Sequence, residues 1–156
     1  MPDWLTHIVI ALIFAEIINT EKKSLVILGT LLPDILSKLY LIFFYLGLPP
    51  YVTLGSFHTP FMTFLVTLLV APLFRYHRAK TLILLNVGML SHYLSDIMLR
   101  HYVGGIRMLW PLSEQQYILN WFWSDQAIYL LAISLAAYFL IRWSKTSHFI
   151  NTKHKV

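Results

Sequence analysis

A histidine and a carboxylate lie four residues apart in the apolar stretch LSHYLSDIM. His92 and Asp96 therefore fall on one face of a helix, one turn apart. A neutral imidazole and a carboxylate at this spacing form half of a site for a divalent metal. The alternative is that Asp96 pairs with Arg100, four residues further on, while His92 bonds to a neighbouring helix. The spacing alone leaves both interpretations open.

A second carboxylate, Asp34, follows a proline inside another apolar stretch. Pro33 removes one backbone donor and clashes with the carbonyl group of Gly29, which predicts a kinked or broken helix. Lipid tolerates a freed carbonyl only where protein or water receives it, so Asp34 is expected to point into a helix bundle. The alternative is a plain proline kink in which Lys38 neutralises Asp34.

Two further histidines stand where helices are expected to begin. His7 occurs in WLTH and His58 in SFHTPF, where Thr59-Pro60 is typical of a helix start. Each histidine could be an interfacial or capping residue, and the alternative interpretation of each is a metal ligand.

Composition identifies the class of protein that holds these residues. The chain has 156 residues, of which 58% are hydrophobic and 12% charged, with mean hydropathy +0.65 and no cysteine. Soluble domains carry about 25% charged residues, so a small single-domain membrane protein is indicated. The lack of cysteine excludes disulfides, iron–sulfur clusters and thiolate zinc sites. The net charge of +5 is scattered thinly, with no stacking platform, which argues against nucleic acid as a partner.

The apolar stretches predict an all-α fold, a polytopic membrane bundle of four to five transmembrane helices within one domain, 1–156, without a sheet. About 20 helical residues cross a hydrocarbon core of about 30 Å. The first stretch is short and contains Glu16, so it could instead lie flat. The Trp-rich piece at 113–123 suits the membrane interface. The expected spans are 4–19, 24–46, 59–75, 80–100 and 126–143.

Basic residues predict the orientation. Nine of the twelve lysines and arginines fall on one side of a five-span chain, while Arg100 and Arg107 fall on the other. The positive-inside rule then places the amino terminus outside the cell (plasma or inner) membrane, together with the 48–57 and 101–125 loops, and the carboxyl tail in the cytoplasm. The nine are Lys22, Lys23, Arg75, Arg78, Lys80, Arg142, Lys145, Lys153 and Lys155.

The predicted topology places all the candidate residues at a similar depth in the membrane. In this topology two histidines begin their helices at the outer face, and the remaining candidates lie in the outer halves of helices that run outward. Intramembrane ionisable groups cost upward of about 2.5 kcal/mol each, so each needs a partner or a role. Three histidines and two carboxylates at one depth predict a site for one divalent metal, with zinc the first candidate and manganese the second. These ligands are His7, Asp34, His58, His92 and Asp96.

The same residues, in this order, resemble the membrane-bound metal-dependent hydrolase family, the YdjM-like group. The matching pieces, from residue 5 to 111, are LTHIVIA, GTLLPDI, FHTPF, MLSHYLSDIM and GIRMLWP. The resemblance implies an integral membrane protein whose presumed metal ligands match the five residues above. The family pattern is itself distantly similar to zinc-dependent phospholipase C and nuclease folds.

The chain departs from the family pattern at two places. Many members read PDIDH where this chain has Pro33-Asp34-Ile35-Leu36-Ser37, and HRGxTHS where it has only SFHTP. One acidic residue and two histidines are therefore missing, which argues against a second metal and a two-metal mechanism.

These observations favour a metal-dependent membrane hydrolase that acts on a lipid or another phosphoester at the outer leaflet. Asp34 or Asp96 would ligate the metal or act as general base, and Arg107 would hold an anionic head group. The alternative for Arg107 is a loop arginine at the lipid interface. Three other functions stay open: a scaffold with a structural metal, an accessory subunit, and a small transporter or channel. Membrane lipid is the expected partner, and a second copy of the chain stays open.

Overall fold

The computed structural model describes residues 4–47, 57–100, 105–123 and 126–153. The fold is all-α, as predicted, and the expected 48–57 loop lies outside these residues except for its last position. A short 3-10 helix, η1 (Ala71–Leu73), extends one of the α-helices. The α-helices are α1 (Trp4–Ile17), α2 (Lys23–Tyr45), α4 (Pro60–Val70), α5 (Arg78–Met98) and α6 (Ala127–Lys153).

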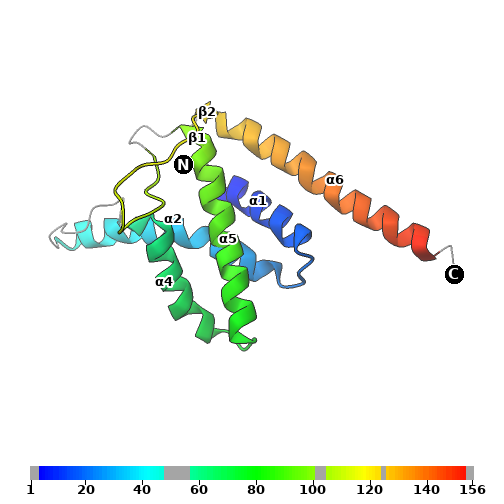
Figure 1. The fold of residues 1–156 in the computed structure, drawn as a ribbon, viewed down its shortest axis with the longest axis horizontal. Coiled ribbons are helices and arrows are strands. Elements are labelled where there is room, and N and C mark those ends of the chain that lie inside the picture. The colour runs from blue at the N-terminus through cyan, green and yellow to red at the C-terminus, as the bar shows by residue number, and fades with distance from the viewer. Residues whose placement is uncertain (1–3, 48–56, 101–104, 124–125, 154–156) are drawn as a thin grey trace.

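Helices α2 and α5 cross at the centre of the bundle, and two glycines permit their contact (Figure 1). A Cβ atom added to Gly88 would lie 2.0 Å from the carbonyl oxygen of Val26. One added to Gly29 would lie 2.0 Å from the carbonyl oxygen of Leu85. Since no side chain fits at either glycine, the two backbones touch directly.

The remaining helices surround this crossing. Helix α1 packs against α2, α5 and α6, and α6 extends away from the bundle toward the carboxyl terminus (Figure 1). Helix α4 lies along α5, where the hydroxyl groups of Thr63 and Tyr93 are 2.8 Å apart. One turn further on, the amide of Asn86 donates to Thr67 Oγ1 at 3.1 Å. These hydrogen bonds supplement apolar packing, as polar side chains do between membrane helices.

The connection between α5 and α6 is extended rather than helical. Strand β1 (Leu99–Arg100) pairs in parallel with β2 (Phe122–Trp123), and Ile106 bridges to Tyr117. The expectation of no sheet therefore needs this small correction, although helices supply most of the buried core among the described residues. Ile106 is buried against α5, which holds the 105–123 segment over the end of that helix.

Two sequence expectations about the spans need correction. Helix α2 continues through Pro33 without a break, so the proline does not divide it. Among the described residues, only Arg78–Met98 and Ala127–Ser147 are long and apolar enough to cross a membrane, rather than four or five helices. Helix α4 has 11 residues, about 16 Å, where about 30 Å of hydrocarbon must be crossed.

Candidate metal centre

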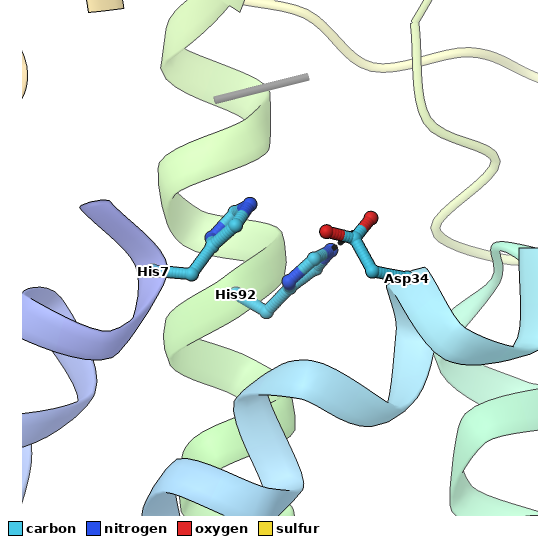
Figure 2. Close-up of side chains that lie close together, drawn as sticks. All are labelled: His7, Asp34 and His92. Atoms are coloured by element: carbon cyan, nitrogen blue, oxygen red, sulfur yellow. Dashed lines mark ion pairs between the residues drawn. The ribbon is translucent and has the colours of Figure 1, made fainter. Parts of the chain in front are cut away.

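The five predicted ligands come from four separate segments and lie together. His7 is on α1, Asp34 on α2, His58 two residues before α4, and the last two on α5. The side chains of His7, His92 and Asp34 converge from three helices in Figure 2. His7, His92 and Asp96 are fully buried, Asp34 is 1% exposed, and the His58 side chain is 16% exposed. We call these five residues the histidine–aspartate cluster.

Asp96 lies among all three histidines. Its Oδ2 atom is 2.8 Å from Nε2 of His58 and 3.2 Å from Nε2 of His92. Its Oδ1 atom is 3.4 Å from Nε2 of His7. The carboxylate therefore has the same ring nitrogen, Nε2, of each histidine around it.

His92 connects the other members of the cluster. Nε2 of His92 lies 3.5 Å from Nε2 of His58 and 4.0 Å from Oδ1 of Asp34. The rings of His7 and His92 are stacked, with centroids 3.9 Å apart. Two triads, one of His7, Asp34 and His92 and one of His58, His92 and Asp96, each offer ligand atoms within 4.8 Å of one another.

Hydrogen bonds on the far side of two rings determine which nitrogen carries the proton. Nδ1 of His58 lies 3.3 Å from the carbonyl oxygen of Pro33, which can only accept. Ser95 Oγ lies 2.7 Å from the carbonyl oxygen of His92 and 2.9 Å from Nδ1 of His7, and with its proton on the carbonyl it accepts from Nδ1. When these rings are neutral, their Nε2 atoms are therefore unprotonated acceptors that face a carboxylate.

This arrangement fits a divalent cation. Lone pairs of imidazole and carboxylate repel one another unless a proton or a cation lies between them. Tetrahedral zinc ligands at 2.0–2.1 Å from the metal are about 3.4 Å apart. Nε2 of His92 lies at similar distances from Nε2 of His58, 3.5 Å, and from Oδ2 of Asp96, 3.2 Å. His7 Nε2 and Asp34 Oδ1 are buried without a hydrogen-bond partner among the described residues. Both atoms would be satisfied by a shared cation.

Comparison with known proteins identifies the family. The model of the YdjM inner membrane protein family matches residues 1–152. The chain belongs to this family. Membership confirms the resemblance carried by the five sequence pieces and agrees with the two helices able to span a membrane. Neither a curated protein nor a solved structure matches the chain.

The rival arrangement would pair each carboxylate of this YdjM-family chain with the base four residues further on. The ammonium group of Lys38 lies 4.0 Å from the ring centroid of Trp4. The guanidinium group of Arg100 lies 4.0 Å from the ring centroid of Trp123. The carboxylates of Asp34 and Asp96 approach histidines, as candidate ligands of one cation would.

Arg107, predicted to hold a head group, lies outside the histidine–aspartate cluster. Its Nη1 atom is 2.9 Å from Oε2 of Glu114, within the 105–123 segment. Its neighbour Ile106 packs against Tyr93, whose ring is 5.5 Å from that of His58. The YdjM-family fold thus holds Arg107 in the segment that covers the cluster-bearing end of α5, paired with an acid.

Sequence reasoning missed the groups that orient the ligands. Ser95 could have been noticed in the sequence, because a serine next to Asp96 in an apolar helix must form a hydrogen bond within its helix or to another helix. Nothing in the sequence except the proline itself points to the carbonyl oxygen of Pro33 as a hydrogen-bond acceptor. The acceptor that orients His58 lies 25 residues away in the sequence, so only the tertiary structure of the YdjM-family chain reveals it.

Proposed function

We propose that this chain is a metal-dependent hydrolase of the membrane that cleaves a lipid or another phosphoester and holds one divalent cation. The observation that carries the proposal is the convergence of three Nε2 atoms on the carboxylate of Asp96 in a buried position. Two carboxylates against one dication balance the charge, which lowers the cost of burial.

The donor set suits zinc first and manganese second. Imidazole nitrogen and carboxylate oxygen are borderline and hard donors, and the chain has no thiolate to offer. His7, His58, His92 and Asp96 would be the ligands, with Asp34 at their edge. Bound there, the cation would polarise a phosphoryl or acyl oxygen and lower the pKa of water.

Asp34 has the position of a general base in this proposal. Its Oδ1 atom is 4.0 Å from Nε2 of His92, further out than the oxygens of Asp96. A buried carboxylate beside the ligands can accept a proton from water. His58 is the most exposed member of the cluster, so a substrate would enter on its side. Arg107 would orient an anionic head group after release from Glu114.

The second candidate is a scaffold with a structural metal. The observation in its favour is burial, since four of the five side chains are at most 2% exposed. Structural sites are closed, whereas catalytic sites keep one position open for water or substrate. Loss of the cation from a scaffold would unfold the bundle without removing any hydrolytic activity.

The membrane arrangement belongs to the same proposal. Four or five helices would lie within the bilayer, with the shorter ones reaching part of its depth. The nine-to-two distribution of basic residues supports an amino terminus outside, a cytoplasmic carboxyl tail and the histidine–aspartate cluster toward the outer leaflet.

A hydrolysis assay on purified protein separates the enzyme from the scaffold. We expect release of product from phospholipid and bis-nitrophenyl phosphate that stops with a chelator and returns with zinc. His92→Ala should abolish it, while Lys38→Gln, which alters a charge outside the cluster, should keep it. A correctly folded, zinc-loaded protein without activity on either substrate would favour the scaffold.

A further inference from the structure

The end of the bundle opposite the histidine–aspartate cluster is strongly basic. Along α5, Lys80 and His92 are 12 residues apart, about 18 Å. We define the basic end by seven lysines and arginines, and among the described residues the segments that carry them, 16–23, 75–80 and 142–145, contain two acids, Glu16 and Glu21. The seven are Lys22, Lys23, Arg75, Arg78, Lys80, Arg142 and Lys145.

Glu16 neutralises only part of this charge. Its carboxylate is buried and pairs with Lys23, with Nη1 of Arg142 at 3.1 Å and with Nζ of Lys145 at 3.5 Å. Three cations on one carboxylate leave two positive charges in excess. The helices α1, α2 and α6 are thus joined by a group that attracts a further anion.

A groove of about 420 Å³ opens beside this group. Its walls are apolar, formed in part by Ile18 and Ile83, and its polar lining includes Asn19 and Lys80. Asn19 accepts a hydrogen bond from Lys145 at 3.2 Å, which connects the groove to the Glu16 group. Lys80 is exposed and forms no ion pair with any residue in the described ranges.

We propose that this groove binds an anionic phospholipid, with its phosphate against Lys80 and an acyl chain along Ile18 and Ile83. An apolar wall beside an unpaired cation at the end of a membrane bundle fits a ligand that is both anionic and apolar. Basic pockets between membrane helices bind such head groups, and each lysine near the surface contributes about 1 kcal/mol. The site is independent of the metal and of any hydrolysis.

Native mass spectrometry of the detergent-solubilised protein, titrated with single lipids, tests the proposal. Phosphatidylglycerol should bind at least tenfold more tightly than phosphatidylcholine. Lys80→Gln should weaken phosphatidylglycerol about fivefold and leave phosphatidylcholine unchanged, because only the charge is lost. Lys38→Gln, at a lysine outside the basic end, is the matched control and should bind as the parent does.

A second pair of variants tests the groove itself. Ile83→Trp should fill it and displace phosphatidylglycerol, whereas Ile133→Trp on the exposed face of α6 should not. Equal binding of the two lipids, or equal effects of Lys80→Gln and Lys38→Gln, would overturn the proposal. Glycerol phosphate that bound as tightly as the lipid would also overturn it, because the apolar wall would then be irrelevant.

Discussion

Ser95 accepts a hydrogen bond from Nδ1 of His7 at 2.9 Å, across the contact between α5 and α1. The serine takes the role of acceptor when its own proton goes to the carbonyl oxygen of His92, 2.7 Å away. One hydroxyl group therefore holds the His7 ring with its Nε2 lone pair directed at Asp96. A side chain outside the predicted ligand set decides the tautomer of a predicted ligand.

Ser95→Ala should weaken the affinity for zinc about 10–100-fold, the usual cost of losing a group that orients a ligand. The reason is that His7 would be free to rotate or to change its tautomer. Isothermal titration of the metal-free protein with zinc measures the effect. Ser95→Thr, which keeps the hydroxyl group, should restore most of the affinity.

The control for this change is Ser134→Ala, at a buried serine on α6. It should leave zinc affinity unchanged. If the two alanine variants bound zinc equally well, the role given to Ser95 would be wrong.

Gly88→Ala should destabilise the bundle by about 1–3 kcal/mol or more, as overpacking of a tight contact does. The new methyl group would lie 2.0 Å from the carbonyl oxygen of Val26, so α2 and α5 would have to move apart. Thermal unfolding in detergent measures the loss. Gly47→Ala meets no atom within 4 Å, and only its positive φ of 66° opposes the change, so its cost should be about 1 kcal/mol.

Because Asp34 and His92 lie on the two helices that Gly88 brings together, Gly88→Ala should also weaken zinc binding. An alanine variant with unchanged unfolding temperature and zinc affinity would contradict the backbone contact.

Asp34→Asn should weaken zinc affinity, whereas Lys38→Gln should not. The structure directs Lys38 to the ring of Trp4 and Asp34 to His92, so only the carboxylate is electrically coupled to the cluster. Zinc titration of both variants decides between the cluster and the alternative i, i+4 ion pair. A larger loss in Lys38→Gln than in Asp34→Asn would restore that pair.

Local spacing explains why much of the fold and cluster could be predicted. His92 and Asp96 share a helical face by periodicity alone. Hydropathy located α1, α2, α4 and α5 to within about five residues, whereas α6 continues ten residues past its expected end. The single depth of the candidates, inferred from topology, agrees with their convergence.

The features that sequence could not supply depend on contacts between distant segments. Glu16 meets Arg142 at a separation of 126 residues, and no local rule joins them. Of the kink or break expected at Pro33, the break is absent, because helix α2 continues through this residue. The proline removes one hydrogen bond of α2, and four residues before it the helix packs tightly on α5 at Gly29.

Cysteine labelling tests the proposed orientation, and the natural chain has no cysteine to interfere. A cysteine at Gln115 should react with a membrane-impermeant maleimide in intact cells, while one at Thr146 should react only after lysis. The reason is the excess of basic residues on the Thr146 side. Equal or reversed labelling would reject both the orientation and an outer-leaflet cluster.

Metal analysis of the purified protein tests the histidine–aspartate cluster most directly. Mass spectrometry of the acid-digested protein should find one zinc, or one manganese, per chain. The His92→Ala/Asp96→Ala double variant should contain none, while a Glu114→Gln variant, changed outside the cluster, should keep the full amount. A parent protein without a stoichiometric transition metal after growth and reconstitution in zinc, or a double variant that retains it, would contradict the metal centre.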